Sequence, residues 1–244
     1  MNQFEGQNIL ITGATGSLGS GIAKALYAAG ADLLLSGRNS KKLEALGHML
    51  GAKTLVADLN LSEDRAQLIE KAESLNGVVF AAGVAPIKPI KYLKETEFSE
   101  TLTLNTKQPV ILLRDLIKAK KIREGGSIIW LSSIAAQLST PGYSMYAASK
   151  AGMEAAARCL ALELAPQGIR LNCLSPGMID SVMAQEAGEQ ISEAVLAEHF
   201  EEYPLGVGRT ADVTGAVNFL LSPAARWITG TVLTLDGGLS LKKG

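Results

Sequence analysis

The chain has 244 residues, of which 47% are hydrophobic and 19% are charged, and its formal net charge is −1. This length and apolar content suit one large α/β domain, and the absence of a basic stripe argues against nucleic-acid binding. No apolar run is long enough to span a bilayer, and the first residues, MNQFEGQN, do not resemble a signal peptide. We expect Cys159 and Cys173 to be buried and reduced, which favours a cytoplasmic protein. His48 and His199 lack partners at ligand spacing, so no metal site is expected.

Short apolar runs alternate with amphipathic helical segments over the whole chain. Strands are predicted at 8–11, 32–36, 53–56, 77–80, 126–131, 169–174 and 230–235. Helices are predicted at 16–29, 40–50, from 62 onward, and at 98–120, 143–165, 192–203 and 210–221. Strands that alternate with helices in this way form a parallel sheet covered on both faces. We therefore expect one doubly wound, Rossmann-like α/β domain over 1–244, with a cofactor half at about 1–130 and a catalytic and lid part at about 131–244.

The first predicted strand runs into a glycine-rich turn, Thr12-Gly13-Ala14-Thr15-Gly16-Ser17-Leu18-Gly19. Ligands of doubly wound sheets bind beyond the carboxyl ends of the strands. Glycines at such a turn let the backbone approach a pyrophosphate, and the following helix N-terminus offers free N–H groups and a favourable dipole. The turn alone could be structural, but its position between a strand and an amphipathic helix favours nucleotide binding.

The stretch from Leu131 to Lys150 joins a predicted strand to a predicted helix and carries three candidate catalytic groups. Tyr146 and Lys150 are four residues apart, so both side chains project from one face of a helix. A nearby ammonium favours the phenolate form of a tyrosine, which makes it a better acid–base catalyst near neutral pH. Ser133 ends the strand, where its hydroxyl could bind a substrate oxygen. A helix without a catalytic role can also have a Tyr and a Lys on one face, so the other motifs must show whether this pair is catalytic.

The order and spacing of these motifs resemble those of the short-chain dehydrogenase/reductase family over essentially the whole chain. Asn105 precedes Ser133 by 28 residues, and Ser133 precedes Tyr146 by 13. Further stretches that resemble family motifs are Asp58-Leu59, Ala81-Ala82-Gly83, Ser175-Pro176-Gly177, Trp227-Ile228-Thr229-Gly230 and Asp236-Gly237-Gly238. The resemblance implies an NAD(P)-dependent oxidoreductase that transfers hydride between nicotinamide and a carbonyl or secondary alcohol.

The resemblance also implies a role for each catalytic residue. Tyr146 would exchange a proton with the substrate oxygen, and Ser133 would orient that oxygen. Lys150 would lower the pKa of Tyr146 and bind the nicotinamide ribose. Asn105 would hold a water that links Lys150 to solvent.

The implied contacts with cofactor and substrate are spread along the chain. Those with the cofactor are Gly13, Thr15, Gly16, Ser17, Leu18, Gly19, Arg38, Asp58, Leu59, Ala82, Gly83, Asn105, Tyr146, Lys150, Pro176, Gly177, Ile179 and Ser181. Those with the substrate are Ser133, Tyr143 and Tyr146, with Tyr143 as a lip of the pocket. The thirteen-residue spacing to Tyr146 favours Ser133 over its neighbour Ser132 as the catalytic serine.

Three positions depart from the family pattern. The glycine turn has the GxxGxxG spacing of the family's larger, two-domain branch, so Ser17 occupies the usual second-glycine place. We expect Gly16 to supply the sharp turn, so that cofactor binding survives. Ala81 replaces the Asn of an NAG turn, and Ser181 replaces a Thr whose hydroxyl would serve the nicotinamide carboxamide.

The choice of cofactor depends on the end of the second predicted strand, Ser36-Gly37-Arg38-Asn39. An acid there would bind the ribose 2′-OH of NAD, whereas an Arg fits the 2′-phosphate of NADP. The acid is absent and Arg38 is present, so NADP(H) is favoured, with NAD(H) as the alternative. Arg38 could also simply begin a solvated helix.

The substrate is the least determined feature. The chain is similar to 3-oxoacyl-[acyl-carrier-protein] reductases, which implies an acyl-carrier-bound carbonyl substrate. Those reductases often carry an Arg where this chain has Gln167, although a group of cations before the fifth strand could help to receive an acidic carrier: Lys118, Lys120, Lys121 and Arg123. A small ketone, sugar or polyol is an alternative substrate, and a non-catalytic NADP-binding regulator is an alternative function. The segment 178–208 is expected to form a lid.

Assembly into a homotetramer or homodimer is also expected. Members of the family usually form such oligomers, and the second half of the helix at 143–165 is nearly all small or apolar, with alanines at 155, 156, 157 and 161. A helix that is apolar on most sides is buried against more than its own sheet.

Overall fold

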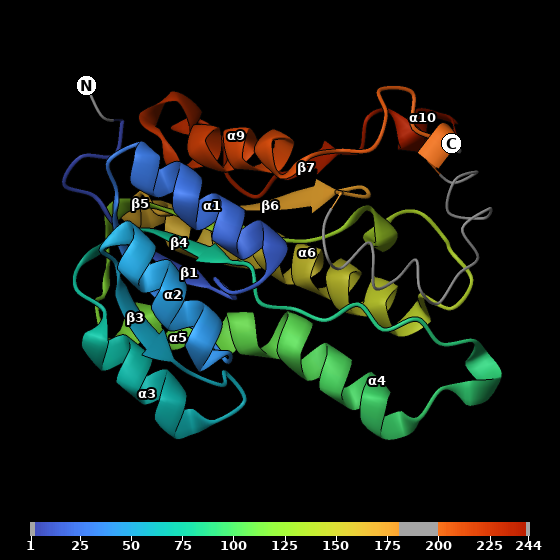
Figure 1. The fold of residues 1–244 in the computed structure, drawn as a ribbon, viewed down its shortest axis with the longest axis horizontal. Coiled ribbons are helices and arrows are strands. Elements are labelled where there is room, and N and C mark those ends of the chain that lie inside the picture. The colour runs from blue at the N-terminus through green and yellow to red at the C-terminus, as the bar shows by residue number, and fades with distance from the viewer. Residues whose placement is uncertain (1–2, 181–199, 243–244) are drawn as a thin grey trace.

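The computed structural model describes residues 3–180 and 200–242. Its centre is one parallel sheet of seven strands in the order β3-β2-β1-β4-β5-β6-β7 (Figure 1). The strands are β1 (Asn8–Thr12), β2 (Asp32–Gly37), β3 (Lys53–Val56), β4 (Leu75–Phe80), β5 (Ile122–Leu131), β6 (Arg170–Pro176) and β7 (Val232–Leu235). The helices are α1 (Ser17–Ala28), α2 (Ser40–Leu50), α3 (Ser62–Lys71), α4 (Glu95–Leu102), α5 (Gln108–Lys118), α6 (Ser144–Leu164), α9 (Thr210–Leu221) and α10 (Leu239–Lys242). The predicted doubly wound fold is confirmed.

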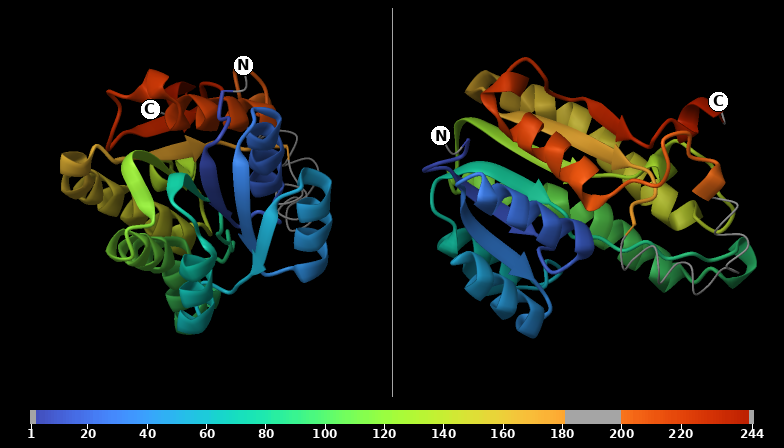
Figure 2. Two further views of the ribbon diagram at one scale, coloured as in Figure 1. Left: turned by 90° about the vertical axis from the view of Figure 1, so that its left-hand side faces the viewer. Right: turned by 45° about the horizontal axis from the view of Figure 1, so that its top comes forward.

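Helices cover both faces of the sheet, as the two further views in Figure 2 show. On one face, apolar residues of α1, α2 and α9, such as Leu26 and Val213, pack into a core with β1, β2 and β6. On the other face, residues of α3, α5 and α6, such as Leu112 and Met153, form a second core. Burial on both faces explains why the strands read as continuous apolar runs rather than as alternating patterns.

The strand order reverses between β1 and β4, which pair side by side. The chain proceeds from β1 outward through β2 to β3, and then returns to β4 and proceeds the other way to β7. The connections that leave the carboxyl ends of β1 and β4 therefore diverge, and this divergence opens a crevice where ligands of such sheets bind.

The helix predicted at 98–120 is interrupted. α4 ends at Leu102, a π turn covers Thr103–Lys107, and α5 begins at Gln108. Pro109 gives the physical reason, because it has no N–H to donate to the carbonyl of Asn105 four residues earlier. The Gln108 N–H bonds instead to the Thr103 carbonyl, five residues back.

One further expectation changes. Cys159 is exposed, whereas Cys173 is buried as predicted. Cys159 lies on the side of α6 that faces away from the sheet, the side that also exposes Leu162. The predicted helix at 192–203 and Ser181 fall mostly or wholly in 181–199, outside the described residues. None of the helices in the described ranges is long and apolar enough to cross a membrane.

The glycine-rich turn owes its shape to Gly13 rather than to Gly16, contrary to expectation. Gly13 has a φ of +67°, and a Cβ built on it would lie 2.4 Å from the backbone nitrogen of Ala82. Gly16 has a φ of −76°, which any residue adopts, and a Cβ there would meet nothing closer than 3.4 Å. A Cβ on Gly19 would lie 2.2 Å from the Gly13 carbonyl oxygen. Gly13 and Gly19 therefore allow β1, β4 and α1 to meet closely.

This difference predicts unequal effects of two alanine substitutions in the same turn. Gly13→Ala should lower the free energy of unfolding by more than about 2 kcal/mol, because it adds both a strained φ and a clash with backbone. Gly16→Ala should cost less than about 1 kcal/mol. Urea unfolding of both variants measures this, and equal costs would contradict the assignment of the turn to Gly13.

Candidate active site

A cleft of about 880 Å³ opens at the carboxyl edge of the sheet. Its walls come from the first turn of α1 at Leu18, from Arg38 directly after β2, and from the segments 83–87, 132–135, 138–140 and 176–179, together with α4 and the start of α10. Most of the segments that carry the sequence motifs meet here. Nine predicted site residues line the cleft: Leu18, Arg38, Gly83, Ser133, Tyr143, Tyr146, Pro176, Gly177 and Ile179.

Tyr146 and Ser133 lie together in this cleft, brought there by the first turn of α6 and the end of β5. The Ser133 hydroxyl lies near enough to the Tyr146 hydroxyl to act on its pKa. Burial raises the pKa of Tyr146, and the influence of Ser133 partly offsets that rise. The ring of Tyr143 lies edge-on to that of Tyr146, with centroids 6.0 Å apart, which fits the expected lip of the pocket. The neutral phenol, held at a serine hydroxyl, is suited to give a proton to an oxygen bound between them.

Lys150 lies one turn further along α6 and is 5% exposed. Its Nζ donates to the Leu131 carbonyl over 2.7 Å and lies 5.7 Å from the centroid of the Tyr146 ring. Burial lowers the pKa of Lys150 to about 8, against the opposing influence of Cys173 and Glu154. Burial has the largest influence on the Tyr146 pKa, and the Lys150 ammonium faces the end of β5, so the lowering of that pKa by Lys150 stays a prediction.

Asn105 is fully buried in the π turn, and its side chain is saturated by hydrogen bonds. Oδ1 accepts from the Val84 N–H at 2.9 Å, while Nδ2 donates to the Val84 carbonyl at 2.8 Å and to Ser149 Oγ at 2.9 Å. The side chain therefore ties the loop after β4 to α6, and both of its N–H groups are used within the chain. The Asn105 backbone carbonyl, whose α-helical donor is missing at Pro109, could accept a hydrogen bond from the expected water.

The cofactor end of the cleft begins at α1. No side chain caps α1 in the described part of the chain, so its first N–H groups stay available to an anion. Arg38 is exposed at the same end. Asp58 accepts from the Asn60 N–H, Leu59 is buried in the core, and Asn60 lines the cleft in their place. An uncapped helix start beside an unpaired guanidinium fits a phosphorylated dinucleotide.

The other end of the cleft contains residues that the sequence did not identify. One face of α4 contributes Glu97, Glu100 and Thr101, and of these the helix predicted to begin at 98 left out Glu97. Glu97 Oε1 pairs with Lys88 at 3.0 Å, whereas its Oε2 is buried with no hydrogen-bond partner in the described structure. An apolar wall completes this end, formed by Ile87, Ile134, Leu138, Met178 and Leu239.

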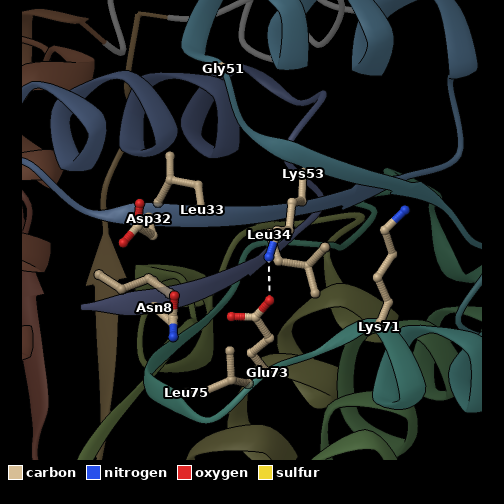
Figure 3. A pocket seen from close by; sticks show the side chains of 10 residues that line it. Asn8, Asp32, Leu33, Leu34, Gly51, Lys53, Lys71, Glu73 and Leu75 are labelled. Atoms are coloured by element: carbon tan, nitrogen blue, oxygen red, sulfur yellow. Dashed lines mark hydrogen bonds and ion pairs between the residues drawn. The ribbon is translucent and has the colours of Figure 1, made fainter. Parts of the chain in front are cut away.

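A smaller depression of about 290 Å³ lies at the amino edge of the sheet (Figure 3). Its polar groups are largely matched within the protein, since Lys53 pairs with Glu73 and Lys71 donates to the Thr54 carbonyl. The described residues also contain no cluster of three or more His, Cys, Asp or Glu that could hold a metal ion. The chemistry is therefore assigned to the larger cleft.

Known proteins resemble both the sequence and the fold. A family model described as enoyl-(acyl carrier protein) reductase matches residues 13–240. The 3-oxoacyl-[acyl-carrier-protein] reductase FabG of Rickettsia typhi is 37% identical over 98% of this chain and 99% of that protein. The chain belongs to the short-chain dehydrogenase/reductase family.

Solved structures of short-chain dehydrogenases/reductases have the same fold. One from Mycobacterium ulcerans matches with a TM-score of 0.91 at 28% identity, covering 98% of this chain and 91% of the other. A short-chain dehydrogenase/reductase titled glucose/ribitol dehydrogenase, from Brucella melitensis, also matches with a TM-score of 0.91, at 29% identity and 97% and 98% coverage. The protein is thus an NAD(P)-dependent oxidoreductase of this family.

Proposed function

We propose that the protein is an NADPH-dependent ketoreductase that acts on a 3-oxoacyl thioester. The observation that carries the proposal is the Ser133–Tyr146 pair, which lies between an anion-binding end of the cleft and an apolar end. The first end fits a phosphorylated cofactor, and the second fits an acyl chain. The 37% identity to a protein named 3-oxoacyl-[acyl-carrier-protein] reductase supports the same class of substrate.

The proposed mechanism follows from the protonation states of the buried groups. NADPH, when bound, supplies the hydride that reduces the carbonyl carbon. Ser133 orients the carbonyl oxygen, and Tyr146, kept neutral by its raised pKa, gives that oxygen its proton. The charge of Lys150 stabilises the phenolate that is left. A water at the Asn105 carbonyl would then connect Lys150 to solvent and restore the proton.

Arg38 supports NADPH as the preferred cofactor. Its side chain is exposed at the cofactor end and has no ion pair with any described residue. A guanidinium can make paired, charge-assisted hydrogen bonds to a 2′-phosphate. NAD lacks that phosphate, so NAD(H) remains the alternative that the measurement below tests.

A carrier-bound substrate would have to be received at the cleft, yet the cations noted in the sequence lie elsewhere. The four cations are Lys118, Lys120, Lys121 and Arg123, and they lie around the amino end of β5, at the edge of the sheet opposite to Ser133. They do not line the cleft. The proposal therefore rests on the thioester and its acyl chain rather than on carrier docking.

A second candidate is a small hydroxylated ketone, such as one related to a sugar or polyol. The Glu97 carboxylate at this end of the cleft favours it, because carboxylate oxygens accept hydrogen bonds from ligand hydroxyls. Glu100 lines the same end of the cleft. The solved structure titled glucose/ribitol dehydrogenase is a relative of this kind.

We also propose that the protein forms a homodimer or homotetramer. The outward side of α6 exposes Ala155, Cys159 and Leu162, three and four residues apart, which makes a continuous small and apolar stripe. Leu162 is 76% exposed in the single chain, and Trp227 is 90% exposed. Large apolar side chains left in water on one surface mark an interface.

The catalytic roles predict distinct losses in two variants. Tyr146→Phe should lower kcat for carbonyl reduction at least about a hundredfold with little change in NADPH affinity, because only the proton donor is removed. Lys150→Ala should lower both kcat and NADPH affinity, because the same side chain supports proton transfer and binds the cofactor. Steady-state assays and fluorescence titration measure the two effects. A Tyr146→Phe variant that keeps more than a few per cent of wild-type kcat would refute the role.

The cofactor proposal predicts that Arg38→Ala weakens NADPH binding by roughly ten- to a hundredfold, the equivalent of ~1.5–3 kcal/mol. NADH binding should scarcely change. Lys42→Ala is the matched control, because it removes an exposed charge of the same sign from α2 outside the cleft. An acid at Gly37 is a poorer test, since its Cβ would lie 2.9 Å from Thr15 Oγ1. An unchanged ratio of kcat/KM for the two cofactors in Arg38→Ala would show that the phosphate is recognised elsewhere.

The two substrate classes are separated by Glu97→Gln, with the exposed Glu95→Gln as control. A 3-oxoacyl thioester and a ketose are assayed with wild type and both variants. We expect a higher kcat/KM for the thioester, altered less than about threefold by Glu97→Gln, because an acyl chain needs no carboxylate. A preference for the ketose that falls about tenfold or more in Glu97→Gln alone would favour the second candidate.

A further inference from the structure

A buried carboxylate lies behind the catalytic residues, on the side of Lys150 away from the cleft opening. Glu154 is on α6, one turn after Lys150, and is 6% exposed. Its Oε1 accepts a hydrogen bond of 2.6 Å from Ser132 Oγ. A buried carboxylate is costly unless it is paired and hydrogen-bonded, so its position beside a catalytic lysine calls for an explanation.

Glu154 and Lys150 hold two consecutive residues at the end of β5. Lys150 Nζ donates to the Leu131 carbonyl, and Glu154 accepts from the next side chain, Ser132. The Ser132 N–H in turn bonds to the Leu174 carbonyl of β6 at 2.7 Å. The residue that follows is Ser133, whose hydroxyl meets Tyr146. The direction in which Ser133 leaves the strand is therefore fixed by both charges of α6.

The charged and titratable groups around Lys150 come from two elements. On α6 they are Tyr146 and Glu154, and on β6 the thiol of Cys173 faces the same space. Burial and then Glu154 raise the pKa of Cys173 to about 12, with Arg158 and Lys150 acting in the opposite direction, so this thiol is neutral near pH 7. Among the described residues, Glu154 is therefore the carboxylate whose negative charge favours the Lys150 ammonium.

We propose that Glu154 is a positioning residue for the reaction, which keeps Lys150 charged and orients Ser132, and through it Ser133, toward the substrate. The catalytic part of this inference rests on the roles proposed above for Tyr146 and Lys150. The electrostatic part does not, because it concerns only groups of this chain.

The expected sign of the effect follows from the charges. Lys150 is needed protonated, so its contribution is present below its pKa and is lost as the pH rises through it. Without the Glu154 charge, burial of Lys150 is less compensated and its pKa falls below about 8. Removing a negative charge also favours the Tyr146 phenolate. Both changes move the alkaline limb of the rate profile for carbonyl reduction to lower pH.

The test compares Glu154→Gln with two controls. Glu154→Gln keeps an oxygen for Ser132 and removes the charge, Ser132→Ala removes the hydrogen bond and keeps the charge, and Glu163→Gln removes an exposed charge of α6. The alkaline limb of kcat/KM should move down by about one pH unit in Glu154→Gln only. Ser132→Ala should instead lower kcat without moving the limb.

A spectroscopic measurement on the cofactor-free protein separates the two parts. The lysines are labelled at 13Cε for NMR, and the Lys150 signal is assigned by its loss in Lys150→Arg. The pH at the midpoint of the Lys150 titration should fall by about one unit in Glu154→Gln and stay in place in Glu163→Gln. This result stands or falls independently of whether the wild type reduces a thioester or a ketose.

Three outcomes would overturn the proposal. An unmoved Lys150 midpoint in Glu154→Gln refutes the electrostatic part. A moved midpoint with an unmoved alkaline limb refutes the catalytic part, and an equal shift in Glu163→Gln refutes the assignment to Glu154. If Glu154→Gln does not fold, Glu154→Asp replaces it: the retained charge should keep the midpoint within about 0.3 unit of wild type while kcat falls, and a larger shift contradicts the role of the charge.

Discussion

Two oppositely charged side chains of α6, Lys150 and Glu154, form hydrogen bonds to the carboxyl end of β5, and the geometry of the site depends on these bonds. Lys150 bonds the Leu131 carbonyl and Glu154 bonds Ser132, so the strand cannot shift relative to the helix without breaking a buried, charge-assisted hydrogen bond. Ser133 and Tyr146 belong to the strand end and the helix, respectively. The two side chains are thereby held close to each other before any substrate binds, which is the preorganisation that proton transfer requires.

A second set of contacts joins this pair to the cofactor half of the molecule. Asn105 connects the loop after β4 to α6 through Val84 and Ser149, and the close approach of Gly13 to Ala82 connects the turn before α1 to the same loop. A cofactor bound at α1 and a substrate bound at Tyr146 would thus lie against one continuous, rigid framework. The α4 wall is different, because it places the side chains of Glu97 and Glu100 at a mostly apolar end of the cleft. That contrast is the reason for testing two substrate classes.

Regular features of the sequence predicted most of the fold and several site residues. The short apolar strands and the glycines after β1 gave the parallel sheet and the location of the cleft, and the four-residue spacing of Tyr146 and Lys150 gave their common helix face. The errors arose where a local pattern has two physical outcomes. Pro109 was compatible with a continuous helix but produced a π turn, and an apolar helix with Cys159 was compatible with full burial but left that side in water.

The sequence by itself determined the sheet, the order of the motifs and many of the groups that line the cleft, because the sheet depends on periodicity and the motifs on spacing along the chain. Only the tertiary structure decided how those groups are charged and held. Tyr146 has a raised pKa because neighbouring segments bury it, and Lys150 faces the Leu131 carbonyl because β5 ends beside α6. The pairing of Glu154 with Ser132 spans 22 residues. Burial and contacts between distant segments are properties of the packed chain, and no local pattern encodes them.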